Sequence, residues 1–213
     1  MTTASTTAQL IRLVVGDDPR AWEAAGFTVA DDRVQIGQVS IELTGSAGPE
    51  RGITAWGFDR EVADVVDGVL TLESSARPAQ TAPHPNGVAR WDHLVMMSPD
   101  MDRSRAALAG TGFEARRTRE YEMKGTAMEQ TFFWMGDVIL ELVGPAQASG
   151  EGPASLWGLA FVAEDLDTTV EYLGDRCSES RVAVQKGRRI ASLRHKDLNI
   201  TVPIAFMTPH IDV

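Results

Sequence analysis

His93 and Glu141 are the two side chains whose types and positions most directly suggest chemistry in this sequence. His93 stands in RWDHLVMMSPDMD (90–102), near the start of a segment apolar enough to be a buried strand. Glu141 stands in a second such segment, VILELVGP (138–145), where a carboxylate needs a partner because burying an isolated charge is costly. A histidine beside a glutamate can bind a metal, act as an acid–base pair, or satisfy the hydrogen bonds of both groups.

Strand periodicity predicts which other side chains share a face with these two residues. Alternation along the first segment places Met97 on the same side as His93. Gly136-Asp137 predicts a two-residue hairpin turn, and the resulting pairing opposes Phe132 to Glu141. This face is largely apolar with a few polar groups, which is typical of a small-molecule pocket. Its further members are Gln130, Trp134, Ile139 and Val143.

An internal repeat predicts how these strands are arranged. The segments IGQVSIELTG (36–45) and MGDVILELVG (135–144) align without a gap, and a Gly-Phe pair lies upstream of each. A third copy begins at LWGLAFVAEDLD (156–167) and a shorter fourth copy at ITAWGFDR (53–60). Glu42 is the counterpart of Glu141 in the first copy. No histidine stands in the matching first strand there, so we interpret Glu42 as a structural carboxylate.

The clearest copy predicts a strand, a helix and three more strands. The first strand covers 91–97, and Asp100 can cap a helix that runs through Leu108. The three later strands are predicted over 113–122, 128–135 and 138–144. Four such βαβββ units would form an α+β protein with curved mixed sheets.

Two segments rich in Gly, Pro and Ser divide the chain. The first, 74–88, is predicted to be a linker, and the second, 146–154, a long loop. We expect residues 10–73 to form a degenerate, truncated half. Residues 89–210 are expected to form one domain of two complete βαβββ modules.

Composition excludes several classes of protein. The chain of 213 residues carries 20 Lys and Arg against 30 Asp and Glu, and a formal charge of −10 argues against a nucleic-acid partner. No apolar run is long enough to span a bilayer, and MTTASTTAQ lacks the pattern of a signal peptide. The single cysteine, Cys177, excludes an internal disulfide and fits a reduced, cytoplasmic setting. A homodimer stays compatible with the sequence.

Taken together, the repeat and these residues make the sequence similar to the vicinal oxygen chelate superfamily, which includes glyoxalase I and bleomycin-resistance proteins. The resemblance is strongest over 89–210, in WDHLVMMSPDMD, VILELVGP and GLAFVAEDLD. It implies a glyoxalase-like fold in which paired βαβββ modules form a cup around a small-molecule ligand. It also implies a divalent metal (Zn, Fe, Mn, Ni or Mg) held by the first and last strands of two modules. His93 matches the first-strand ligand position and Glu141 the last-strand position.

The last module departs from this family pattern. Its counterpart of His93 is Gly158, and its counterpart of Glu141 is Ala205 or Val202, depending on how the strands are aligned. None of these side chains can ligate a metal, whereas a catalytic divalent metal normally takes at least three protein ligands. Three hypotheses therefore stay open: a metal site completed by water and substrate, by Gln130 or by Glu42, a metal-free His–Glu pair, and a buried pair without chemistry.

Further candidate ligand-binding residues lie on the strands of the last two modules. Arg188 and Arg189 are adjacent on a predicted strand, so one should face the cup and bind a substrate carboxylate. Arg116 and Arg117 form a similar pair on a strand that is predicted to be more exposed. Gly158, Ala205 and Met207 are further candidate substrate-binding residues, and Met207 is large enough to fill part of the cup.

Three functions fit these residues. The first is an enzyme of isomerase, lyase or ring-opening type acting on a small oxygen-bearing metabolite, with His93 and Glu141 as acid–base groups or metal ligands. The second is a non-catalytic protein of the bleomycin-resistance type, without metal, that binds and sequesters a small molecule. The third is a scaffold or dimer module whose cup is filled by its own side chains.

Overall fold

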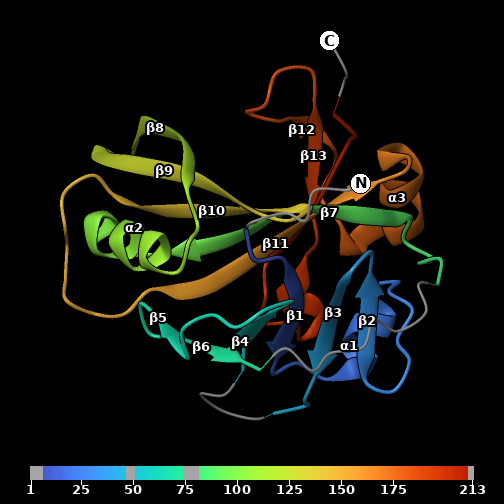
Figure 1. Cartoon of the computed structure of the whole chain (residues 1–213). Helices are drawn as coiled ribbons and strands as arrows, with labels where there is room; N and C mark the ends of the chain where they lie inside the picture. The colour runs from blue at the N-terminus through green and yellow to red at the C-terminus, as the bar shows by residue number, and fades with distance from the viewer. Residues whose placement is uncertain (1–6, 47–50, 74–81, 211–213) are drawn as a thin grey trace, which may run out of the picture.

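The chain folds into two curved sheets with few helices (Figure 1). The computed structural model describes residues 7–46, 51–73 and 82–210. Both sheets mix parallel and antiparallel pairs, so the predicted α+β class is confirmed. No helix within these ranges is long and apolar enough to cross a membrane.

The larger sheet has eight strands in the order β12-β13-β14-β11-β7-β10-β9-β8. Two βαβββ units build it, and they meet where β11 pairs antiparallel with β7. Short 3-10 turns cover Gly174–Arg176 and His195–Leu198. The first unit comprises β7 (Val88–Met97), α2 (Met101–Gly110), β8 (Ala115–Met123), β9 (Thr126–Met135) and β10 (Val138–Pro145). The second comprises β11 (Ser155–Ala163), α3 (Leu166–Leu173), β12 (Arg181–Val182), β13 (Arg189–Ser192) and β14 (Ile204–Met207).

Local signals in the sequence explain where these elements begin and turn. The carboxylate of Asp100 accepts from the amide of Arg103 at 3.0 Å, and that of Asp165 accepts from Thr168 at 2.9 Å. Each carboxylate thereby satisfies an amide that the first helical turn leaves free. Gly136 takes a positive φ of 74° in the β9–β10 turn, a conformation that glycine adopts without steric cost. The strands on both sides pair in the predicted register.

The smaller sheet repeats this plan with six strands, in the order β2-β3-β1-β4-β6-β5. β1 is parallel to β3 and antiparallel to β4, just as β7 is parallel to β10 and antiparallel to β11. Residues 59–64 connect β4 to β5 without a helix. The domain boundaries stay a prediction, because 74–81 lie outside the described residues. The elements are β1 (Leu10–Val15), α1 (Pro19–Ala24), β2 (Arg33–Ile36), β3 (Val39–Leu43), β4 (Ile53–Phe58), β5 (Val65–Val66) and β6 (Val69–Leu72).

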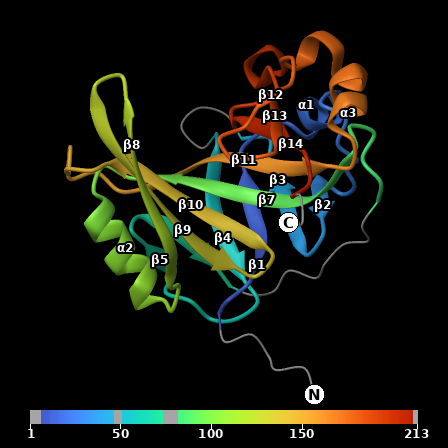
Figure 2. The same ribbon diagram turned by 90° about the horizontal axis from the view of Figure 1, so that it is seen from above.

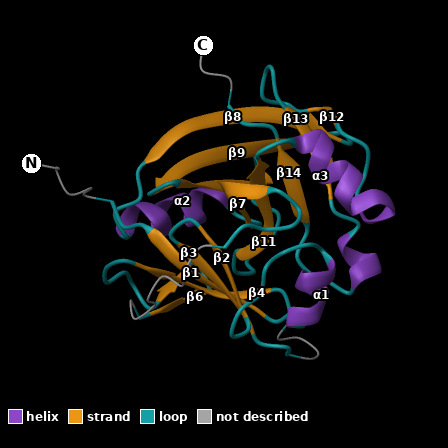
Figure 3. Ribbon diagram, turned by 90° about the vertical axis from the view of Figure 1, so that its right-hand side faces the viewer, coloured by secondary structure: helices purple, strands orange, loops and turns teal. Residues whose placement is uncertain are grey.

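One aromatic core joins the two sheets, which Figure 3 shows one above the other. The ring of Phe27 lies 5.7 Å from that of Phe161, and the ring of Phe58 lies 5.3 Å from that of Phe113. Each pair joins the first half of the chain to the second. All four side chains are at most 2% exposed, so both contacts are fully withdrawn from water.

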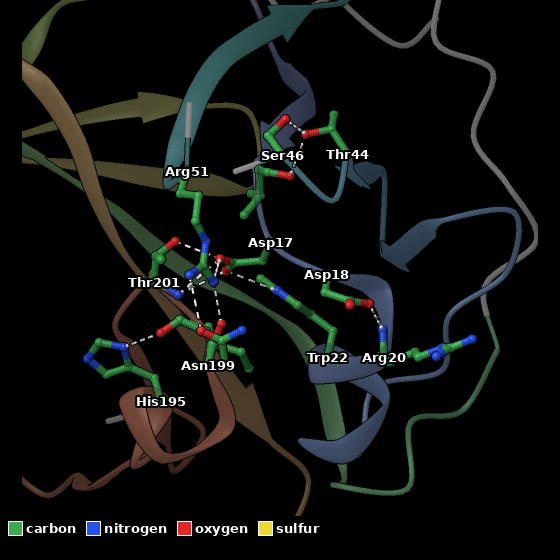
Figure 4. A network of polar contacts seen from close by, with 12 residues as sticks. Asp17, Asp18, Arg20, Trp22, Thr44, Ser46, Arg51, His195, Asn199 and Thr201 are labelled. Atoms are coloured by element: carbon green, nitrogen blue, oxygen red, sulfur yellow. Dashed lines mark hydrogen bonds and ion pairs between the residues drawn. The ribbon is translucent and has the colours of Figure 1, made fainter. Parts of the chain in front are cut away.

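A buried carboxylate fastens the two halves at a second place (Figure 4). Asp17 is 0% exposed and accepts hydrogen bonds from the amide of Thr201 at 3.0 Å and its hydroxyl at 2.6 Å. Trp22 Nε1 and Arg51 donate to the same carboxylate, each at 3.3 Å. With several donors around it, this buried charge is compensated, and it fixes the larger sheet relative to the smaller one.

Candidate functional site

A cavity of about 690 Å³ in the larger sheet contains both His93 and Glu141. Strands β7, β9 and β10 line one part of it, and the β12–β13 hairpin and β14 line another. Figure 2 shows the hairpins β8–β9 and β12–β13 on either side of β7. Other predicted pocket residues line the same cavity, among them Gln130, Phe132, Trp134, Ile139 and Met207.

The register of β10 against β7 brings the two polar side chains together. Ile139 pairs with His93, so Glu141 lies two residues farther along the neighbouring strand on the same face. His93 Nε2 is 3.3 Å from Glu141 Oε2, and the two side chains are 14% and 13% exposed. Gln130 Nε2 donates to the other oxygen of Glu141. Strand parity and hairpin pairing thus place His93 and Glu141 as the sequence predicts.

Asp92 holds the second nitrogen of the imidazole, and sequence analysis missed it. Ala160 pairs with His93 but Phe161 pairs with Trp91, so Asp92 is the extra residue of a β-bulge. A bulge can turn two successive side chains toward one side of a strand, which strict alternation forbids. The Asp92 carboxylate accepts from His93 Nδ1 at 2.8 Å. The carboxylate thereby holds a proton on Nδ1, while Nε2 faces Glu141 and the cavity.

Arg188 keeps Asp92 ionised. Its side chain is 2% exposed, and it donates to Asp92 Oδ2 and, at 2.9 Å, to the carbonyl of Thr208. Burial alone would raise the pKa of Asp92, but the hydrogen bonds and charges of His93 and Arg188 outweigh burial and lower this pKa to about 2. His210 Nε2 lies 3.6 Å from the same carboxylate. Asp92 is therefore an anion throughout the neutral pH range.

Glu141 has the opposite electrostatic environment. Burial raises the pKa of its carboxyl group, and the charges of His93 and Arg119 oppose that shift only in part. A carboxyl group with a raised pKa takes up a proton more readily near neutral pH. One acid of the site is therefore fixed as an anion, and the other is prepared to exchange a proton.

Arg188 and Arg189 do not line the cavity, against our expectation that one of them would. Their side chains do diverge, as alternation requires, but a carboxylate of the protein holds each one. Arg188 pairs with Asp92, and Arg189 pairs with Asp167 at 2.8 Å on the surface. Both guanidinium groups already have anionic partners, so neither is free to bind a ligand.

Met97, Gly158 and Ala205 also lie outside the cavity lining. Leu159 pairs with Ile204, and this register makes Ala205 rather than Val202 the counterpart of Glu141. Among the described residues, no group of three or more His, Cys, Asp or Glu side chains could hold a metal ion. His93 and Glu141 offer two donors where a catalytic metal centre usually needs three. The residues present do not fit the metal centre that the family resemblance implies.

Other cations line the cavity instead, and of these the sequence had offered Arg116 and Arg117 as a second, more exposed candidate pair. Arg116, Arg117 and Arg119 reach it from β8, and Arg181 and Lys186 reach it from the β12–β13 hairpin. Sequence analysis treated β8 as an exposed strand, which it is, but did not foresee that the curved sheet turns it toward the cavity. The run EARRTRE (114–120) was the available signal.

The first half of the chain carries an inert version of the same pair. Its ladder pairs Arg12 with Ser40, which corresponds to Ile139 in the ungapped repeat, so Arg12 is the counterpart of His93. Arg12 contacts Glu42 at 2.6 Å. A guanidinium does not release its proton at physiological pH, so this pair cannot transfer one. Glu42 is thus a structural carboxylate, as expected.

Comparisons with known proteins bear on the fold. No family model matches the chain, and no curated protein matches it. A mutant of 4-hydroxymandelate synthase from Streptomyces coelicolor superposes with a TM-score of 0.65 and 13% identity, over 97% of this chain and 94% of the other. A variant of homoprotocatechuate 2,3-dioxygenase from B. fuscum gives a TM-score of 0.58 and 15% identity, over 99% and 75%.

A fusion of a xylose isomerase-like TIM barrel with 4-hydroxyphenylpyruvate dioxygenase gives a TM-score of 0.63 and 11% identity. That match covers 99% of this chain and 50% of the other. These structural neighbours belong to the vicinal oxygen chelate superfamily. Similarity at such identities concerns the fold alone. The chain has the glyoxalase-like fold of this superfamily.

Proposed function

We propose that this chain is an enzyme that moves a proton on a small oxygen-bearing molecule bound in the cavity, as isomerases, lyases and ring-opening enzymes do. One observation carries the proposal: His93 Nε2 and Glu141 Oε2 lie 3.3 Å apart in the same cavity. Asp92 and Arg188 also support the proposal, because Asp92 binds the other nitrogen of the imidazole and Arg188 binds Asp92. Together they fix the tautomer and the orientation of the ring.

The reaction step follows from the protonation states of these groups. Nε2 of neutral His93 accepts a proton from a carbon next to a carbonyl, and the C–H electron pair moves into an enolate. The ionised Asp92 stabilises the imidazolium that forms. Glu141, when protonated, returns a proton to a second position of the substrate and then accepts one from the imidazolium. The outcome is isomerisation, or elimination where the neighbouring carbon carries a leaving group.

Hydrogen exchange tests this step without knowledge of the natural substrate. Pyruvate, oxaloacetate and acetoacetate are incubated with the protein in D2O, and loss of their enolisable C–H signals is followed by NMR. For at least one of them, exchange should be faster with the wild type than without protein. His93→Ala and Glu141→Gln should each lower the catalysed rate by about 10²-fold or more.

The control variant is His195→Ala, because His195 lies outside the cavity and its Nδ1 is hydrogen-bonded to the carbonyl of Ile200. This variant should exchange at the wild-type rate. Exchange that is as fast in His93→Ala as in the wild type, for every member of the panel, would contradict the proposal.

A binding and sequestration protein is the second candidate. The absence of donor side chains at Gly158 and Ala205 favours it, because the last module then contributes no polar group at the family's ligand positions. Under this alternative a ligand binds in the cavity, no exchange occurs, and His93→Ala still binds it. Metal analysis addresses the metal-assisted variant: a stoichiometric divalent metal that disappears in His93→Ala would support ligation by His93 and Glu141.

A further inference from the structure

We infer that the natural ligand of this cavity is a multiply charged anion, with phosphate or carboxylate groups at two separate places. The inference rests on the proposed function, since it names the substrate class of the same site. The cavity is lined by five cationic side chains and a single carboxylate, that of Glu141. The chain as a whole has a formal charge of −10, so this excess of positive charge in one cavity is opposite in sign to the net charge of the protein.

These five side chains lack the partners that arginines have elsewhere in the protein. Within the described residues, none of the five forms an ion pair. Arg119 lies over the ring of Tyr121, 5.5 Å from its centroid, and its charge also acts on the carboxyl group of Glu141. Carboxylates of the protein hold many of the other arginines, including Arg12, Arg51, Arg103, Arg105, Arg188 and Arg189.

A second β-bulge concentrates the arginines on β8. Ala115 pairs with Phe133 and Arg117 pairs with Phe132, so Arg116 is the extra residue. The bulge lets Arg116 and Arg117 both border the cavity, just as the bulge at Asp92 lets that residue support His93. The bulges at Asp92 and Arg116 thus serve the same cavity.

The positions of the cations indicate where the anionic groups of the ligand would lie. β9 separates β8 from β10, so an anionic group at Arg117 and Arg119 sits about two strand spacings, roughly 10 Å, from the backbone of Glu141. Arg181 and Lys186 approach from the β12–β13 hairpin. Apolar side chains line the space between these groups: Phe132, Trp134, Ile139, Ile190 and Met207. The fitting ligand has an anionic group near each edge and a carbon skeleton between them.

A small anion fits this site better than a polyanionic polymer does. The cavity volume of about 690 Å³ is that of a metabolite site, and the formal charge of −10 on the whole chain disfavours a nucleic acid. Phosphate and carboxylate groups share the geometry that a guanidinium fork recognises. The experiment below distinguishes a phosphorylated ligand from a polycarboxylate.

Calorimetric titration at constant ionic strength, with pyrophosphate, citrate and acetate as probes, tests the inference. Pyrophosphate or citrate should bind at least tenfold more tightly than acetate, and the tighter of the two indicates a phosphorylated or a polycarboxylate ligand. Arg117→Met and Arg119→Met should each weaken that binding about tenfold. Arg194→Met is the matched control, because Arg194 is exposed, makes no ion pair within the described residues and lies outside the cavity.

Two outcomes would overturn the inference. One is equal, weak binding of all three probes. The other is a loss of affinity in Arg194→Met as large as in Arg117→Met. Selective binding of a probe without proton exchange on any carbonyl compound would leave this inference standing and would remove the proposed catalysis alone.

Discussion

The contact between Asp92 and Arg188 gives a quantitative prediction, because the neighbouring Arg189 supplies an internal control. We expect Asp92→Asn to lower the free energy of unfolding by about 3 kcal/mol at pH 7. The side chains of Asp92 and Arg188 are 1% and 2% exposed, so the substitution leaves a buried guanidinium without an opposite charge. Asp92 is also the group that orients His93.

The magnitude follows from the charge interactions of Asp92. Its pKa falls from 3.8 to about 2, and with 1.36 kcal/mol per unit this depression corresponds to about 2 kcal/mol of stability. Leaving Arg188 buried without its partner brings the expected loss to about 3 kcal/mol, the lower end of the range of about 3–5 kcal/mol for breaking a buried ion pair from one side. The folded pKa is depressed, so this stabilisation is present above pH 4 and is lost as the pH falls through 2. The difference between wild type and variant should narrow over the same range.

Urea denaturation at pH 7 and at several lower pH values measures both effects. Asp167→Asn is the control, because Asp167 is 68% exposed and pairs with the 43% exposed Arg189. A surface pair of this kind contributes about 0–1 kcal/mol, so this variant should be close to the wild type. Similar, small losses in both variants would refute the assignment of Arg188 and Asp92 as a mutually dependent buried pair.

Three further predictions concern stability at and around the site. Gly144→Ala should lower the unfolding free energy by about 1–3 kcal/mol or more, measured by urea denaturation, because its Cβ would lie 2.2 Å from the carbonyl oxygen of Ser98. Glu141→Gln should stabilise the protein at pH 8 and do so less at pH 4, because burial raises the pKa of Glu141 and the ionised form is the unfavourable one. His93→Arg should fold with a melting temperature near that of the wild type, since Arg12 occupies the same place in the first half, yet it should catalyse no proton exchange.

The sequence predicted the parts of the fold that depend on local signals. The cap at Asp100, the turn at Gly136 and the pairing around it are decided by neighbouring residues, and the structure has them as predicted. The ungapped match of 36–45 with 135–144 predicted strands in the first half, and 36–45 contains β3. The missing helix between β4 and β5 was not predicted, because the segment 59–64 is too short for its apolar pattern to distinguish a helix from a loop.

The site was predicted only where strict strand alternation holds. Parity placed His93 and Glu141 correctly, but two single-residue bulges overturn alternation at Asp92 and Arg116. A bulge depends on how two distant strands pair, and no composition signal marks it in either segment. The ion pair of Arg188 was not predicted for a related reason. Its partner Asp92 lies 96 residues away, and only the folded sheet brings the two charges together.

Comparison of the internal copies shows what the His–Glu pair adds to this fold. The first copy has Arg12 and Glu42 at these positions, and the last module has Gly158 and Ala205. A sheet of this kind is therefore built equally well with a permanent ion pair or with no polar pair at all, so packing does not require a histidine there. His93 also has supporting groups behind it: the bulge places the Asp92 carboxylate against the imidazole, and the buried Arg188 binds that carboxylate. Burying two further charges behind an imidazole opposes folding unless they are paired. Such an arrangement is expected where the proton on that imidazole has to be controlled.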